Sequence, residues 1–256
     1  GVIPMGSGGP ANEEAVQREY YNRIAREYDA HYTNKHALAY RYGVYDLCLG
    51  DIDLSGMRAL DAMCGGGEAT GYLLQRGASV TGLDISDECC RIYGERFPGC
   101  HVVCKSIRDA EFQPASFDLV LTDSLHHLHP RVDEAIALIH RILKPNGLLC
   151  CWEPSRNSLI DLIRRGWYRL DKRYFQANER AIAVEDVLGR PRVFSPQRVI
   201  YGGSVAYVFV NLSMALRIPV SLVNVYAPFF MSAERVLNRV HPRFLSCWVL
   251  CLVVKQ

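Results

Sequence analysis

The middle of the chain alternates between short apolar runs and segments in which apolar residues return every three or four positions. The apolar runs are typical of strands buried on both faces of a parallel sheet, and they occupy residues 58–63, 78–84, 101–104, 117–122 and 148–152. The periodic segments predict helices at residues 68–76, 87–97 and 131–143. Alternating strands and helices predict an α/β fold built on a mostly parallel sheet.

Further elements are predicted on either side of this alternating core. Residues 12–32 carry an apolar, tyrosine-rich stripe at every fourth position, which predicts a helix, and residues 36–49 predict a second one. Beyond residue 154 we expect a helix at 158–170, a sixth strand near 204–212 and a last strand at 244–254. The chain therefore divides into a flexible lead-in at 1–12, a core with N-terminal helices at 13–154, a cap with one late strand at 155–243 and a final strand at 244–256.

Residues 59–67, A-L-D-A-M-C-G-G-G, join the end of a predicted strand to a glycine-rich bend and the start of a predicted helix. Glycine lets the backbone turn sharply and approach a ligand closely, and a helix start offers free N–H groups. The next predicted strand ends at Asp84, about 20 positions beyond the bend, where an acidic side chain meets ribose hydroxyls in nucleotide-binding folds. A dinucleotide site is less well supported, because the motif G-x-G-x-x-G is absent.

These residues resemble the class I S-adenosylmethionine (SAM) methyltransferases of the small-molecule type. The glycine motif of that family resembles D-x-G-C-G-x-G, and the corresponding residues 61–67 of this chain are D-A-M-C-G-G-G. Met63 stands where the family usually has glycine, so we expect its backbone to avoid the conformations that only glycine allows. The run F-D-L-V at 117–120, the histidine pair that follows it and L-K-P-N-G at 143–147 also resemble family motifs.

The resemblance implies a Rossmann-like α/β sandwich with a mostly parallel seven-stranded sheet, its last strand antiparallel, and a helical cap insertion. It implies SAM as the cofactor and S-adenosylhomocysteine as its product. Asp84 would accept hydrogen bonds from the ribose, and Ser106 or, failing that, Asp109 would accept one from the adenine amino group. The cofactor-binding residues expected on this basis are Tyr21, Tyr28, Arg41, Asp61, Ala62, Gly65, Gly67, Asp84, Ile85, Ser106, Ile107 and Thr122.

For three of these residues a structural alternative stays open. Tyr21 and Tyr28 would either close over the cofactor or pack in the core, since they lie on or beside the apolar stripe of the first helix. Arg41 would either bind the methionyl carboxylate of SAM, because guanidinium binds carboxylates through two hydrogen bonds, or lie at the surface.

His126 and His127 follow the fourth predicted strand, whose end faces the ligand crevice of a parallel sheet. A histidine is a natural general base for an acceptor hydroxyl, so both are candidate catalytic residues. Their alternative role is to fix the loop after the strand, and a carboxylate acceptor would need no base. We expect methyl transfer to a small, fairly apolar molecule, with oxygen as the favoured target. The alternatives are a SAM-binding enzyme that runs another reaction and a non-catalytic binding protein on the same fold.

Composition narrows the class of protein. With 256 residues, 49% hydrophobic and 22% charged, the chain is typical of one globular unit with an insertion, and a net charge of +2 gives no reason to expect nucleic acid as a partner. The 10 cysteines contain no C-x-x-C spacing, so we expect no metal site and favour free thiols in a reducing cytoplasm. Oligomeric state is not predicted.

Two features of the predicted cap bear on its partners. Residues 158–170 contain Arg164, Arg165 and Arg169, which form either a solvated face or a basic mouth for an anionic or aromatic acceptor, and residues 172–180 extend this basic character. Residues 202–233 form an apolar stretch that is long enough to suggest a membrane span, but Arg217 and Pro219 argue against one. Contact with a membrane surface, to reach a lipid-like acceptor, is the minority alternative.

Overall fold

A computed structural model describes residues 10–128, 131–156, 158–170, 181, 193–240 and 242–256. Most of the predicted lead-in and the predicted basic extension at 172–180 lie outside these residues. The described strands form one seven-stranded sheet in the order β3-β2-β1-β4-β5-β7-β6. Their bounds are β1 Arg58–Ala62, β2 Ser79–Asp84, β3 His101–Cys104, β4 Phe117–Thr122, β5 Leu143–Pro154, β6 Phe194–Gly202 and β7 Trp248–Lys255.

The direction of the strands confirms the predicted fold class. Strands β3, β2, β1, β4 and β5 pair in parallel, whereas β7 runs antiparallel to both of its neighbours, β5 and β6. The pleat of the central strand β4 sends Leu119 and Leu121 into one apolar cluster and Val120 into the other. Because both faces of β4 are buried, its sequence is continuously apolar rather than alternating.

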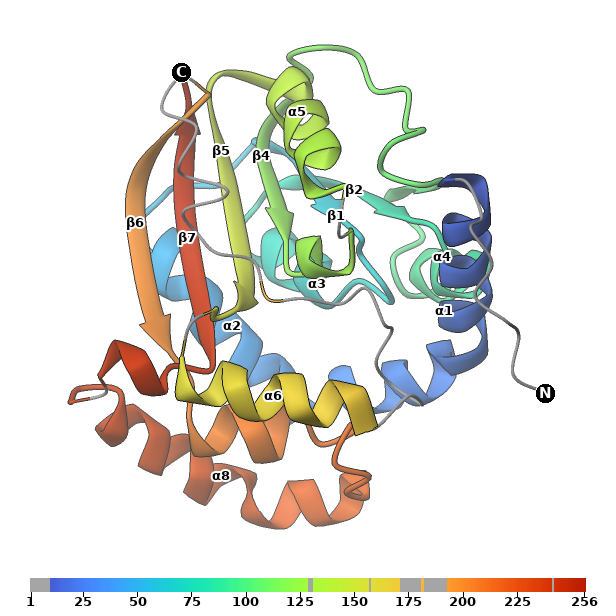
Figure 1. Cartoon of the computed structure of the whole chain (residues 1–256). Helices are drawn as coiled ribbons and strands as arrows, with labels where there is room; N and C mark the ends of the chain where they lie inside the picture. Colours follow the sequence, from blue (N-terminus) through green and yellow to red (C-terminus); the bar gives the residue numbers. More distant parts are fainter. Residues whose placement is uncertain (1–9, 129–130, 157, 171–180, 182–192, 241) are drawn as a thin grey trace.

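Helices cover both faces of the sheet and close one end of it (Figure 1). One cluster joins the sheet to α2 and α3, and the other joins it to α5. The helices are α1 Pro10–Tyr32, α2 Lys35–Leu49, α3 Glu68–Gln75, α4 Asp87–Arg96, α5 Val132–Ile142, α6 Leu159–Leu170 and α8 Val220–Leu237, with short turns η1 Leu125–Leu128, η2 Tyr207–Asn211 and η3 Arg243–Leu245. Helices α6 and α8 lie in the segment predicted to form the cap.

The predicted sixth strand near 204–212 is wrong. This stretch contains a π-helical turn, η2. The strand that pairs with β7 is β6, which ends before this stretch begins. Strand β6 is an edge strand with Pro196, a serine and an arginine, and its register shifts between Pro196 and Arg198. Proline and polar residues are tolerated at a sheet edge, where they hide the strand pattern. The apolar run at 204–212 instead packs against α2 and α8, with Ala206, Tyr207 and Val210 buried.

Candidate functional site

The glycine bend joins β1 to α3 and needs glycine at two points. Gly65 has φ 53°, and its N–H donates to Asp84 Oδ2 at 2.9 Å. Gly67 has φ 92°, and a Cβ there would lie 2.3 Å from Phe97 Cε2. A side chain at Gly67 would therefore be both strained and obstructed. The predicted strand, bend and helix start are all present, and the bend draws the backbone up to the end of β2.

Met63 departs from the expectation for a residue that replaces glycine. Its φ is 61°, a left-handed conformation, so the prediction that its backbone avoids this region is wrong. The turn out of β1 imposes this conformation, because the next N–H, of Cys64, donates to Leu83 O at 2.9 Å on the neighbouring strand. A side chain in this region costs about 1 to 3 kcal/mol. Met63 lines a small cavity beside the bend.

Asp84 is held at the end of β2 by two backbone donors. Its Oδ2 accepts from Gly65 N, and its Oδ1 accepts from Ser86 N at 2.8 Å. Burial raises the pKa of this carboxyl, and the backbone N–H bonds oppose the rise. Each carboxylate oxygen keeps a lone pair for a further donor. Asp84 lines the same cavity as Met63, with a volume of about 50 Å³, hereafter the smaller cavity.

Six predicted cofactor residues line the smaller cavity, namely Tyr21, Tyr28, Gly65, Asp84, Ile85 and Ser106. The hydroxyl of Ser106 donates to Glu14 Oε1 at 2.6 Å, and Glu14 also pairs with Arg108. Because Ser106 donates to a carboxylate, its oxygen can accept from a ligand. Sequence reasoning missed Glu14, which lies 92 residues away on α1.

The other predicted cofactor residues lie behind the cavity wall or deeper. Ala62, Ile107 and Thr122 are buried in the interior, and Gly67 lies at the start of α3. Asp61 is buried as well, and its Oδ2 accepts from Thr70 Oγ1 at 2.7 Å. Burial raises the pKa of Asp61 to about 7. The structure therefore places Asp61 beneath the bend, held by α3.

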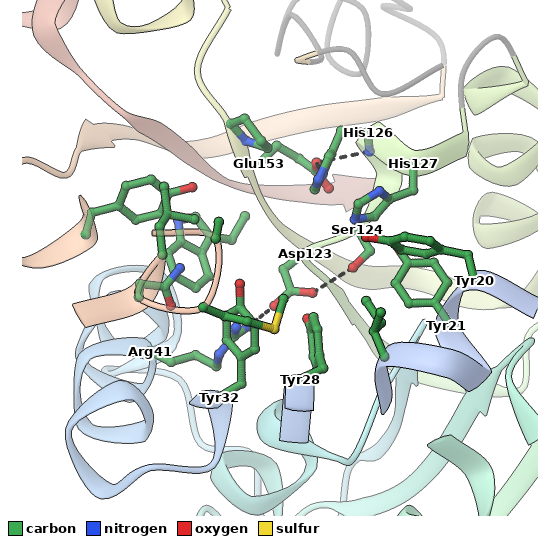
Figure 2. A pocket seen from close by; sticks show the side chains of 18 residues that line it. Tyr20, Tyr21, Tyr28, Tyr32, Arg41, Asp123, Ser124, His126, His127 and Glu153 are labelled. Atoms are coloured by element: carbon green, nitrogen blue, oxygen red, sulfur yellow. Dashed lines mark hydrogen bonds and ion pairs between the residues drawn. The ribbon is translucent and has the colours of Figure 1, made fainter. Parts of the chain in front are cut away.

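A larger cavity of about 120 Å³ adjoins the smaller one (Figure 2). Tyr21, Tyr28, Ser124 and His127 line both cavities. The remaining lining residues are mostly aromatic or apolar and come from α1, α2, the loop and η1 turn after β4, the end of β5, and the cap: Tyr20, Ile24, Tyr32, Arg41, Asp123, His126, Trp152, Glu153, Pro154, Tyr207, Asn211, Leu212, Met214 and Ala215. Tyr21 and Tyr28 of α1 thus belong to a wall common to both cavities. The two roles considered for them, closing over a ligand and packing in the core, are therefore compatible.

Arg41 lines the larger cavity rather than the smaller one. It is only 4% exposed, which excludes a surface role, and it forms an ion pair with Asp123. Its Nη1 donates to Tyr45 Oη at 3.2 Å, and its guanidinium carbon lies 5.1 Å from the centroid of the Trp152 ring. These contacts fix the guanidinium in the wall by charge, hydrogen bonding and cation–π attraction.

His126 is positioned by a buried carboxylate that sequence reasoning did not select. Glu153, at the end of β5 and 2% exposed, lies with Oε2 at 2.7 Å from His126 Nδ1. The same carboxylate accepts from Leu125 N at 2.8 Å and from His126 N at 3.2 Å. His127 packs its ring 3.9 Å from that of His126 and edge-on to Tyr21. The predicted histidines therefore lie together beside the shared wall: His127 lines both cavities, His126 lines the larger one, and Glu153 holds His126 through its ring (Figure 2).

Comparison with known proteins finds a family model and curated relatives that match part of this chain. Residues 59–147 match the family model of a methyltransferase domain. An uncharacterized methyltransferase of Synechocystis is 38% identical over 111 residues, which cover 43% of this chain and 49% of the relative. A fatty-acid O-methyltransferase of Mycolicibacterium smegmatis is 31% identical over 112 residues, 42% of this chain and 41% of the relative. The chain thus spans less than half the length of these curated relatives.

Solved structures extend the likeness of the fold to nearly the whole chain. The [4+2]-cyclase SpnF has a TM-score of 0.67 at 17% identity and covers 100% of this chain and 99% of its own. A 1,6-didemethyltoxoflavin-N1-methyltransferase of Burkholderia thailandensis, solved with its substrate and S-adenosylhomocysteine, has a TM-score of 0.59 at 16% identity, covering 99% and 93%. At these identities the comparison shows the fold, including the cap.

Proposed function

We propose that this chain binds SAM in the smaller cavity and methylates an acceptor oxygen in the larger one, since residues 59–147 match the family model of a methyltransferase domain. The observation that carries the proposal is the wall that the two cavities share, formed by Tyr21, Tyr28, Ser124 and His127. A group transfer needs its two reactants side by side, and alignment alone supplies much of the acceleration.

The residues of the smaller cavity fit SAM by hydrogen-bonding type. SAM offers ribose hydroxyls and an adenine amino group as donors, and Asp84 and Ser106 offer acceptors. The Gly65 backbone leaves room that a side chain would take, since a Cβ there would lie 3.2 Å from Glu68 Oε2. Bound SAM supplies a methyl group activated by a positively charged sulfur.

His126 is the general base in this proposal, and Glu153 positions it. A hydrogen bond from Nδ1–H to Glu153 fixes the imidazole tautomer and leaves Nε2 with its lone pair. Nε2 then takes the proton of an acceptor hydroxyl while the oxygen gains the methyl group. A base of this kind contributes typically about 10²- to 10⁴-fold. We expect the acceptor to be small and fairly apolar, because rings such as those of Tyr20, Trp152 and Tyr207 line the larger cavity.

Calorimetric titration with SAM tests the cofactor half of the proposal. Asp84→Ala is expected to weaken binding, whereas Asp133→Ala, which removes an exposed carboxylate of the same charge from α5, outside both cavities, is expected to leave it unchanged. Absence of binding to the wild-type chain would refute the proposal. Equal affinity in the Asp84 variant would refute the ribose assignment.

Release of S-adenosylhomocysteine tests the transfer itself. We would measure it with hydroxylated aromatic compounds and with fatty acids as separate acceptor sets, since the name of one relative specifies fatty-acid O-methylation. A second candidate is an enzyme that binds SAM without transferring its methyl group, because the same fold occurs in a protein described as a [4+2]-cyclase. Conversion of an acceptor without release of S-adenosylhomocysteine would favour that candidate.

A further inference from the structure

The outer side of α8 carries an apolar stripe that the rest of the described chain leaves exposed. Leu222, Val225, Phe229 and Val236 are 51%, 77%, 71% and 61% exposed. Their spacing of three, four and seven residues places them on one side of the helix, opposite the buried Val223, Ala227 and Glu234. Over these residues the stripe is about 21 Å long at 1.5 Å per residue. We call this surface the α8 face.

The exposed charged residues on α8 and in the chain that follows it, up to η3, have a single sign. Arg235 and Arg239 are exposed at the end of the helix, and Arg243 is exposed in η3 just beyond it. The only acidic residue in the sequence from 202 to 256 is Glu234. It is 3% exposed and occupied internally, since it accepts from Tyr40 Oη at 2.6 Å and from backbone N–H groups near residue 206. This part of the chain therefore presents arginines and apolar side chains without an exposed carboxylate.

The inner side of α8 packs against the wall of the larger cavity. Phe230 stacks on Phe209 of η2 at 5.1 Å between ring centroids, and Tyr226 Oη donates to Phe209 O at 2.5 Å. Two other residues of η2, Tyr207 and Asn211, line the larger cavity. One helix layer thus separates the exposed stripe from the turn that borders the cavity. Figure 1 shows α8 at the end of the molecule where the cap closes the sheet.

We propose that the α8 face rests on a bilayer surface that contains anionic lipids. An amphipathic helix lies in the interface with its apolar side buried about 5 to 10 Å, and nearby arginines are attracted to negative headgroups. The contact that we propose is peripheral. None of the helices that the structure describes is long and apolar enough to cross a membrane. It does not depend on the proposed methyl transfer. A second copy of the chain is disfavoured as the occupant, because residues 202–256 offer no exposed carboxylate to pair with Arg235 and Arg239.

Cosedimentation of the full chain with vesicles tests this proposal. We expect binding to vesicles of phosphatidylcholine mixed with phosphatidylserine, weaker binding to phosphatidylcholine alone, and a loss of binding as salt is raised. The double change Arg235→Ala and Arg239→Ala should weaken partitioning about 25-fold, from about fivefold for each arginine near the surface. Phe229→Ser should weaken it on both kinds of vesicle, because it removes apolar area.

Arg141→Ala on α5 is the matched control, since it removes an exposed arginine from another part of the molecule and should leave binding unchanged. Thermal unfolding of each variant verifies that it is folded. Failure of the wild-type chain to pellet with anionic vesicles would overturn the proposal. Binding that the α8 variants do not weaken would also overturn it. So would a dimer in gel filtration that Phe229→Ser dissociates, if the wild-type chain does not bind vesicles.

Discussion

Replacing Glu153 by glutamine removes one acceptor from a carboxylate that uses both of its oxygens. Oε1 accepts from Leu125 N, and Oε2 accepts from His126 N and lies 2.7 Å from His126 Nδ1. The amide nitrogen of glutamine can only donate, so one of these contacts becomes a donor facing a donor. If the amide nitrogen faces the imidazole, Nδ1 must become the acceptor and the proton moves to Nε2. His126 then has no lone pair at Nε2 with which to act as a base.

The expected loss is large in turnover and moderate in stability. Without the base, kcat should fall by about 10²- to 10⁴-fold. One buried donor left without an acceptor costs about 1 to 3 kcal/mol, and the Tm falls by about 2 to 4 °C for each kcal/mol in a chain of this size. Affinity for SAM should not change, because neither Glu153 nor His126 lines the smaller cavity.

Single-turnover release of S-adenosylhomocysteine at saturating SAM measures this effect, with calorimetry for the cofactor. His126→Gln and the double variant complete a cycle: if Glu153 acts through His126, the double variant should be no slower than His126→Gln alone. Wild-type turnover in Glu153→Gln would refute the positioning role. Loss of turnover together with loss of SAM affinity would instead mean that the pair supports the loop of η1.

Three further predictions concern the glycine bend. Gly67→Ala should destabilise the fold by about 1 to 3 kcal/mol in urea unfolding, because φ is 92° and Phe97 occupies the space of the new Cβ. The control Gly94→Ala inside α4, where a Cβ would meet no atom within 4 Å, should stabilise the fold by about 0.5 to 1 kcal/mol. Met63→Gly should relieve about 1 kcal/mol of strain at φ 61°, and a lower unfolding free energy would contradict this. The pKa of Asp61 is raised to about 7, because burial favours the protonated carboxyl in the folded chain. The stability that the protonated Asp61 contributes to the fold is therefore lost as pH rises from about 4 through 7. Without cofactor, the free energy of unfolding of Asp61→Asn should therefore rise relative to that of the wild-type chain by about 3 kcal/mol between pH 5 and pH 8. A difference that stays constant over this range would refute the burial argument.

The sequence predicted those elements whose pattern is local. Strands β3 and β4 have the predicted bounds. Strand β4 is buried along most of its length and is therefore a mainly apolar run, whereas β3 is a partly exposed edge strand that was recognised from the short run V-V-C after the turn signal Pro98-Gly99. Strand β6 was missed because its edge position tolerates Pro196 and polar residues. The conformation of Met63 was missed because a turn can impose left-handed backbone on a residue that does not favour it.

The missed partners in the site are contacts between distant positions. Glu153 reaches His126 across 27 residues, and Glu14 reaches Ser106 across 92. A lone glutamate after an apolar strand, or on the exposed flank of a tyrosine stripe, has no local signature that names its partner. Only the sheet order, which sets β4 beside β5, and the return of α1 over the sheet edge bring these pairs together.

The way α1 is attached decides how ligands reach the site. Tyrosines of α1 line both cavities. Its contacts with the end of β2 and with α4 include polar ones: Arg18 Nε donates to Ile85 O at 3.2 Å, and ion pairs join Arg26 to Glu88 and Asp29 to Arg96. Exposed ion pairs contribute about 0 to 1 kcal/mol each, far less than the burial of the strands beneath. The smaller cavity, of about 50 Å³, must widen to hold a nucleoside. Lifting α1 would break these polar contacts and would also expose the buried Ile24, Ala25 and Tyr32, so widening the cavity in this way costs apolar burial as well as ion pairs.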